Sequence, residues 1–213
     1  MLKPEPTASG AILAGGASRR MGRDKLGLKV GERTLVARVY DVLRSSCDDI
    51  VMVGSTRIQR LKLGTSMSVR TVPDLRPGRA GPLAGIEAAL AAARHDLVFV
   101  AAGDMPFIPK ELAGSLLELL GQGDARVVVP RHGGRLHPLC AAYHREVLAD
   151  LSFTLNLGVR AVHTFLDNIE GVRYVEEELA LFGDPEQFLM NVNSPEDLER
   201  ARRFSETDSP QGR

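Results

Sequence analysis

The stretch that decides the fold is "LVFVAAGD", Leu97 to Asp104, in which an uninterrupted apolar run ends in glycine and aspartate. A strand that is buried on both faces, in the middle of a parallel sheet, has this continuous apolar character. The carboxyl end of such a strand opens into the crevice where ligands of open α/β sheets bind. We therefore expect a central parallel strand that carries Asp104 to a functional site.

Other apolar runs alternate with segments of helical periodicity along the chain. An apolar stripe from Leu35 to Leu43 predicts one helix, and Ser194 followed by Pro195 indicates the start of a last helix through Arg203. We expect further strands at 11–14, 50–54, 69–73, 126–130 and 136–143, and further helices at 83–94 and 109–120. This alternation predicts an α/β protein, with a three-layer α/β/α, Rossmann-like fold around a mostly parallel central sheet.

The length and charge of the chain limit its class. Its 213 residues suit a single domain, which we expect at 10–204, with a flexible N-terminus at 1–9 and a flexible C-terminal tail at 205–213. The 27 basic residues balance the 27 acidic ones. A neutral chain has no general attraction for nucleic acids or anionic membranes, so neither is expected as a partner.

The two cysteines and the apolar segments point to a cytoplasmic protein. Cys47 and Cys140 are far apart and show no metal-binding spacing, which is typical of reduced thiols. The longest apolar stretches are too short to cross a bilayer, and the N-terminus lacks the apolar segment of a signal peptide.

A glycine-rich segment, "LAGGASRRMGRDK" from Leu13 to Lys25, follows the first expected strand. Two adjacent glycines let the backbone approach a ligand, and successive amide N–H groups in such a turn form an anion site. The basic side chains that follow can bind phosphate oxygens. The sequence has neither a Walker A loop nor the G-x-G-x-x-G pattern. The segment therefore suits a nucleoside triphosphate, the alternative being a tight strand-to-helix turn with a solvated basic face.

The pattern L-A-G-G-x-S-x-R-M-G-x-D-K resembles the signature of nucleotidyltransferases with a GT-A-like fold, and most of all that of the molybdenum cofactor guanylyltransferases. Gly15 stands where relatives that use other nucleotides or substrates typically have alanine, which favours guanylyl transfer. Further segments resemble the same family in the same order: "VPD" at 72–74, "GPLAG" at 81–85, "AAGDMPFIP" at 101–109, "HPL" at 137–139 and "NVNSPEDL" at 191–198.

The resemblance implies an activity and its ligands. GMP would pass from GTP to the terminal phosphate of molybdenum-molybdopterin, which forms the guanine dinucleotide form of the cofactor and pyrophosphate. Mg²⁺ would be the metal, with Mn²⁺ as a substitute. GTP and the molybdopterin cofactor would be the ligands, and cofactor insertion proteins or molybdoenzyme chaperones are candidate protein partners.

Other functions remain open at this point. They are cytidylyl transfer to the same cofactor, nucleotidyl transfer to a sugar or polyol phosphate, and nucleotide binding without catalysis. The last predicts a decayed motif, whereas Lys25 and Asp104 are both intact.

The resemblance also assigns residues to roles. Lys25 and Arg19 would bind the triphosphate, Asp104 would hold the metal, and all three would be catalytic. The expected GTP-binding residues are Leu13, Ala14, Gly15, Gly16, Lys25, Asp74 and Asp104. The expected acceptor-binding residues are Gly81, Gly85, Asn191 and Asn193.

Two of these carboxylates also have structural interpretations. Asp104 could instead form a helix cap or an Asx turn before "MPFIP". Asp74 could be a loop carboxylate paired with Arg76 or Arg79.

Structural interpretations extend to the acceptor-binding candidates. Helix capping alone would explain Gly81 and Gly85, and an Asn-rich turn would explain Asn191 and Asn193. His137, which lies before proline, is interpreted as structural rather than catalytic.

Overall fold

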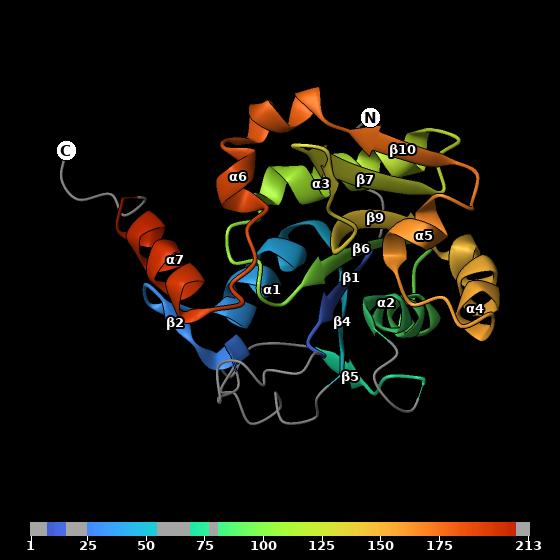
Figure 1. Cartoon of the computed structure of the whole chain (residues 1–213), viewed down its shortest axis with the longest axis horizontal. Coiled ribbons are helices and arrows are strands. Elements are labelled where there is room, and N and C mark those ends of the chain that lie inside the picture. Colours follow the sequence, from blue (N-terminus) through green and yellow to red (C-terminus); the bar gives the residue numbers. More distant parts are fainter. Residues whose placement is uncertain (1–7, 16–24, 55–68, 77–80, 208–213) are drawn as a thin grey trace.

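A mixed β-sheet runs through the centre of the molecule, and helices cover both of its faces (Figure 1). The computed structural model describes residues 8–15, 25–54, 69–76 and 81–207. In spatial order the strands are β10 (Val172–Val175), β7 (Val127–His132), β9 (Cys140–His144), β6 (Leu97–Ala102), β1 (Ala8–Leu13), β4 (Asp49–Val53) and β5 (Arg70–Val72). Strand β8 (Arg135–Leu136) pairs with β7, and β2 (Lys29–Val30) and β3 (Arg33–Thr34) form a separate hairpin.

The part of the sheet from β6 to β5 is parallel. Strand β1 pairs in parallel with both β4 and β6, and β4 pairs in parallel with β5. Strand β9 is antiparallel to both of its neighbours, β6 and β7. The mostly parallel sheet and the helices on its two faces confirm the expected three-layer α/β/α fold.

Each face of the sheet buries its own set of side chains. Along β6, Phe99 points into one layer, while Val98 and Val100 point into the other. The first layer is closed by α1 (Leu35–Ser46) and α3 (Lys110–Gln122), and the second by α2 (Gly81–Ala92), α4 (Leu148–Asn156) and α5 (Val162–Leu166). Burial of one such Val, Leu or Phe side chain contributes about 1.5–3 kcal/mol. This two-sided burial explains why β6 has a continuous apolar sequence.

The C-terminal part of the chain returns to the edge of the body. Helix α6 (Pro185–Phe188) precedes α7 (Pro195–Thr207), which lies beside the β2–β3 hairpin (Figure 1). Leu198 and Ala201 of α7 pack there with Val30 and Leu35. Short 3₁₀ helices span Lys25–Gly27, Arg145–Val147 and Glu177–Phe182.

Three of the differences from the predicted elements change the description of the fold. Strand β1 begins at Ala8, which pairs with Leu97 of β6, and the buried Ser9 donates a hydrogen bond to Asp49 on the neighbouring strand, so residues 8 and 9 are not part of a flexible end. The strand expected at 136–143 is divided into β8 and β9 by a turn in which the N–H of Cys140 bonds to the carbonyl of His137. Helix α7 continues to Thr207, past the expected end of the domain.

Both cysteines are free and buried, which agrees with the prediction of reduced thiols. Burial raises the pKa of each thiol to about 12. Within the part of the chain that the structure describes, every helix is too short or too polar to span a membrane.

Candidate active site

The carboxyl ends of the parallel strands meet at one edge of the sheet, where backbone hydrogen bonds hold three loops together. The N–H of Ala14 bonds to the carbonyl of Val53 at 2.8 Å, which joins the end of β1 to that of β4. The N–H of Gly103 bonds to the carbonyl of Leu13 at 3.0 Å, which joins β6 to β1. The start of the glycine-rich segment is therefore fixed by two neighbouring strands.

Gly15 and Asp74, both predicted to bind the nucleotide, lie side by side in this structure. A β carbon on Gly15 would lie 3.6 Å and 3.8 Å from the two carboxylate oxygens of Asp74, and 3.9 Å from the Cα of Gly54. The carboxylate therefore lies next to the backbone that we expect a ligand to approach. Arg76 pairs with Glu87, so the alternative interpretation, in which Arg76 pairs with Asp74, is wrong.

Lys25, Asp104 and Asn193 form a polar cluster at the same edge. The Nζ of Lys25 lies 2.5 Å from Oδ2 of Asp104 and donates to Oδ1 of Asn193 at 3.0 Å. The side chain of Asp104 is only 10% exposed. Asp104 and Asn193, which follow Lys25 by 79 and 168 positions in the sequence, thus both contact its ammonium group. Asp104 is not a cap of α3, because that helix begins at Lys110 with Pro109 as its N-cap.

The start of α7 holds Asn193 in place. Oδ2 of Asp197 accepts hydrogen bonds from the backbone N–H groups of Asn193 and Ser194, both at 2.9 Å. The Oγ of Ser194 accepts from the N–H of Asp197 at 3.1 Å. This reciprocal arrangement is a capping box and confirms that Ser194 caps the last helix. Because the cap fixes the backbone of Asn193, its side chain is held toward Lys25.

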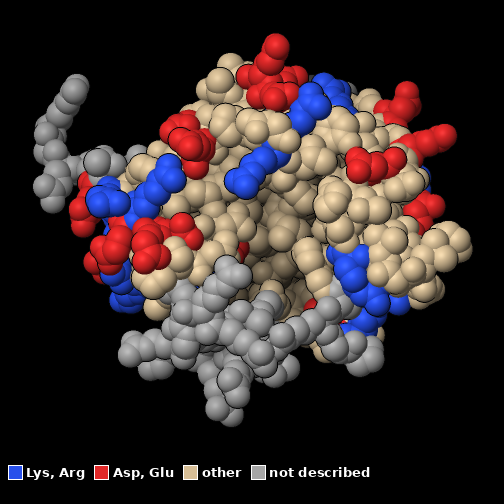
Figure 2. Space-filling view, in the orientation of Figure 1, with Lys and Arg blue, Asp and Glu red and all other residues tan. Residues whose placement is uncertain are grey.

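A cavity of about 720 Å³ lies beside this cluster. It is lined by Asn191 and Met105, by the loop at 134–139 and by the segment at 160–163. Figure 2 shows a hollow near the centre of the face on which the strand ends lie. Because Asn191 lines the cavity while Asn193 contacts Lys25, the two asparagines predicted to bind the acceptor face different surroundings.

Two arginines that the sequence analysis did not identify, Arg135 and Arg160, line the cavity. His137 and His163 line it as well. Burial lowers the pKa of His137, and the nearby His132 and Arg135 lower it further, so its imidazole is neutral at pH 7. No sequence motif links these residues, since they come from separate segments that meet only in the folded chain.

The two glycines of the "GPLAG" segment have different surroundings. Gly81, the first residue of α2, has φ +77°. A β carbon there would lie 3.2 Å from the carbonyl oxygen of Arg160. Gly85 packs against the side chain of Leu13, where a β carbon would lie 3.4 Å away. An acceptor-binding role for either glycine stays a prediction, and both have a packing role in the structure.

Two predicted site residues, Gly16 and Arg19, lie outside the described residues, as does Arg79. The described residues contain no group of three or more His, Cys, Asp or Glu side chains that could hold a metal ion. Mg²⁺ is usually bound through one or two carboxylates together with substrate phosphates, not by a complete protein cage. The single buried carboxylate of Asp104 fits that mode of binding.

Comparison with known proteins identifies relatives over most of the chain. Residues 10–171 match the family model described as the MobA-like NTP transferase domain. A protein of Pelotomaculum thermopropionicum, named "Probable molybdenum cofactor guanylyltransferase", is 41% identical over 200 residues, which cover 93% of this chain and 94% of that protein. The molybdenum cofactor guanylyltransferase of Desulfosudis oleivorans is 32% identical over 195 residues, which cover 91% and 93% of the two chains.

A solved structure has a similar fold. The molybdopterin-guanine dinucleotide biosynthesis protein A of Archaeoglobus fulgidus superposes with a TM-score of 0.77 at 28% sequence identity. The match covers 93% of this chain and 99% of that one.

Proposed function

Because this chain belongs to the MobA-like NTP transferase family, we propose that it is a molybdenum cofactor guanylyltransferase. It transfers GMP from GTP to the terminal phosphate of molybdenum-molybdopterin and releases pyrophosphate. The observation that carries the proposal is the convergence of Lys25, Asp104 and Asn193 at the strand ends, directly beside the start of the glycine-rich segment.

The nucleotide binds along the segment that follows β1. Leu13, Ala14 and Gly15 present backbone groups at a site where Gly15 has no side chain to block a ligand. The Asp74 carboxylate lies beside Gly15 and can accept hydrogen bonds from the nucleoside. The Lys25 ammonium neutralises phosphate charge, and we propose that Gly16 and Arg19 also bind GTP, as the family resemblance implies.

Asp104 is the residue that would hold magnesium. Bound there, the ion would neutralise charge on the phosphates and on the leaving pyrophosphate. The backbone of Asp104 is anchored by a hydrogen bond of 2.9 Å from the N–H of Val192 to its carbonyl oxygen. Its carboxylate therefore keeps a defined position beside Lys25.

The acceptor binds in the cavity beside Asp104. Arg135 and Arg160 line it and suit a ligand that carries phosphate, because guanidinium groups bind phosphate oxygens in a bidentate manner. Asn191 also lines this cavity, and Gly81 lies next to Arg160 of the cavity wall.

The chemistry is an in-line substitution at phosphorus. An oxygen of the acceptor phosphate attacks the α-phosphorus of GTP, and the bond from that phosphorus to the bridging oxygen of the β-phosphate breaks. The electron pair leaves with pyrophosphate. The protein contributes alignment of the two substrates and electrostatic stabilisation of the developing charge.

The cellular setting is part of the proposal. Two free, buried thiols suit a reducing compartment such as the cytoplasm. The product is a cofactor that other enzymes use, so we infer that insertion proteins or molybdoenzyme chaperones receive it.

The test is incubation of the protein with Mg²⁺, molybdenum-molybdopterin and each nucleoside triphosphate in turn, with pyrophosphate release as the measurement. We expect release with GTP, because a site that pairs with one base edge leaves buried polar groups unpaired with another base. Equal release with CTP and GTP would overturn the guanylyl assignment, and release with CTP alone would favour cytidylyl transfer. Release with GTP and a sugar phosphate, but not with the cofactor, would identify a different acceptor.

A further inference from the structure

Glu87 is a buried carboxylate with no part in the proposed chemistry. It lies in the middle of α2 and is 4% exposed. Arg76 donates to it twice, from Nε to Oε2 and from Nη2 to Oε1, both at 2.7 Å. The hydroxyl of Ser152 donates to the same Oε1 at 2.7 Å. Both oxygens of the carboxylate are therefore paired.

Arg76 connects three parts of the fold through this contact. It follows β5, two positions after Asp74, and bonds to Glu87 on α2. Its Nη1 also donates to Oδ1 of Asn156 at 2.8 Å, and its Nη2 to the carbonyl of Ser152 at 3.3 Å, both on α4. The loop at 73–76 is thus attached to two helices of the second layer.

Stability alone does not account for such a pair. Desolvation of two charges offsets much of their attraction, and an apolar replacement of a buried ion pair is often neutral or stabilising. A fully bonded Arg–carboxylate pair does, however, fix geometry, because the planar guanidinium accepts few orientations. Because Arg76 lies two positions after Asp74, the Arg76–Glu87 pair fixes the loop that carries the Asp74 carboxylate.

We propose that Glu87 is a positioning residue for GTP: through Arg76 it holds the loop at 73–76 so that the Asp74 carboxylate stays against Gly15. The inference rests on the proposed function, since it takes GTP as the substrate. Without the pair, Asp74 would sample positions away from Gly15, and the nucleotide would have to order the loop when it binds. Affinity for GTP should fall, while the transfer step itself should change little.

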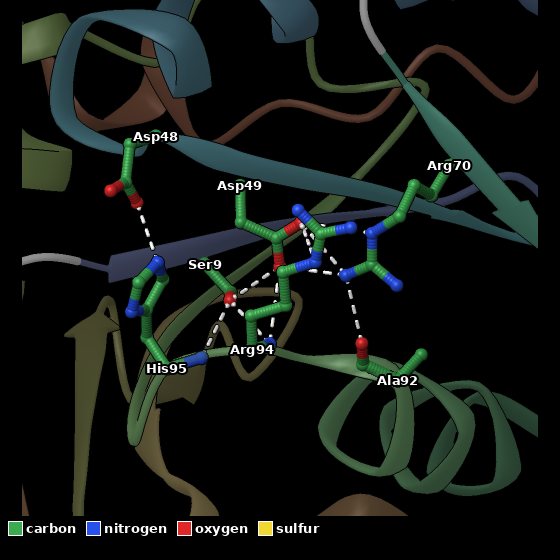
Figure 3. Close-up of polar contacts among 7 residues, drawn as sticks. All are labelled: Ser9, Asp48, Asp49, Arg70, Ala92, Arg94 and His95. Carbon is green, nitrogen blue, oxygen red and sulfur yellow. Dashed lines mark hydrogen bonds and ion pairs between the residues drawn. The ribbon is translucent and has the colours of Figure 1, made fainter.

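The chain offers a matched control at the opposite end of the sheet (Figure 3). Asp49 is also buried, 6% exposed, and accepts hydrogen bonds from an arginine and a serine. Arg70 donates to its two oxygens at 2.7 Å and 2.8 Å, and the Ser9 hydroxyl donates at 2.7 Å. This cluster lies at the amino ends of β1 and β4, whereas the candidate active site lies at their carboxyl ends.

The experiment compares Glu87→Gln with Asp49→Asn, using the full chain. We measure the melting temperature, the Kd of GTP by calorimetry, and KM for GTP and kcat from pyrophosphate release. Both variants should melt at a lower temperature. Only Glu87→Gln should raise the Kd and KM of GTP, on the order of tenfold, with kcat nearly unchanged. Unchanged Kd and KM in Glu87→Gln, or an equal rise in Asp49→Asn, would overturn the proposal.

A double-mutant cycle tests the route through Asp74. In an Asp74→Ala background, Glu87→Gln should add little to the KM of GTP, because the carboxylate that it positions is gone. Independent, multiplying effects would overturn the proposal. Arg76→Lys, which keeps the charge but loses the fork, repeats the test if Glu87→Gln does not fold. Failure of the wild-type protein to bind GTP would instead refute the proposed function.

Discussion

Gly54 and Gly15 pack backbone against backbone at the end of β4. A β carbon on Gly54 would lie 2.7 Å from the nitrogen of Gly15 and 2.9 Å from its Cα, and Gly54 itself has φ +110°. Side chains rarely adopt such a φ. The position of the backbone at Gly15 therefore depends on a glycine that lies outside the glycine-rich segment.

Gly15→Ala should weaken GTP binding without loss of fold. A β carbon there has ordinary van der Waals space within the protein, 3.6 Å from the nearest Asp74 oxygen, but it extends into the path that a ligand would take to the backbone. We expect a higher Kd of GTP by calorimetry and a nearly unchanged melting temperature, with a complete loss of binding in Gly15→Leu.

The matched control is Gly54→Ala, which has no such space. It should lower both the melting temperature and the affinity for GTP. The free energy of unfolding should fall by about 1–3 kcal/mol. Wild-type affinity in Gly15→Ala and Gly15→Leu would mean that the segment is only a turn.

Asp104→Asn should abolish most turnover. The substitution keeps the shape of the side chain but removes the charge beside Lys25, and loss of one preorganised electrostatic element costs about 10²–10³ in rate. The melting temperature should change little, because asparagine can still accept a hydrogen bond from Lys25. The measurement is pyrophosphate release across a magnesium titration. Near-normal turnover at every magnesium concentration would remove Asp104 from the active site.

Asn193→Ala separates two roles for this residue. The family resemblance assigns Asn193 to the acceptor, whereas in the structure its side chain accepts a hydrogen bond from Lys25 at 3.0 Å. We expect the substitution to raise the KM of GTP more than that of the acceptor, because it releases the ammonium group. Asn191→Ala, which alters the cavity wall, should do the reverse. A rise in the acceptor KM alone for Asn193→Ala would favour the acceptor role that the resemblance implies.

The free energy of unfolding should fall in acid, partly through Asp49. Burial raises the pKa of this carboxyl, but hydrogen bonds from Arg70 and Ser9 outweigh burial and lower the pKa below its ordinary value of 3.8. A carboxyl with a lowered pKa adds stability that is complete above the unfolded pKa and is lost as pH falls through the folded pKa. Urea denaturation below about pH 4 should show a steeper loss for the wild type than for Asp49→Asn. Parallel curves would contradict this account.

Much of the fold could be predicted because its core strands have a distinct apolar pattern. The apolar run that ends at Asp104 is buried on both faces in the structure, as its sequence indicates. The direction of β9 could not be predicted, since "CAAYH" is as compatible with a parallel strand as with an antiparallel one. Strand β10 was missed because Arg173 and Tyr174 are exposed and leave only a short apolar pattern.

The candidate site, like the fold, could be predicted only in part. Lys25 and Asp104 belong to local motifs, so the amino-acid sequence alone indicates both. Arg135 and Arg160 carry no local signal, because their significance arises from a cavity formed by distant segments. In the sequence, Glu87 is only a polar residue within an apolar helix. Its role became apparent from the structure, in which Arg76 of the preceding loop pairs with it.

The contact between Lys25 and Asn193 has a consequence for the order in which the enzyme is made. The ribosome releases the chain from its N-terminus, so Lys25 and Asp104 emerge long before their partner. By the time β10 ends at Val175, every strand of the sheet has been synthesised, yet the asparagine that contacts Lys25 is still 18 residues from emerging (193 − 175). A chain released at that point carries the complete sheet without the polar cluster. If the polar cluster is part of the active site, as we propose, we expect full activity only after translation has passed Asn193.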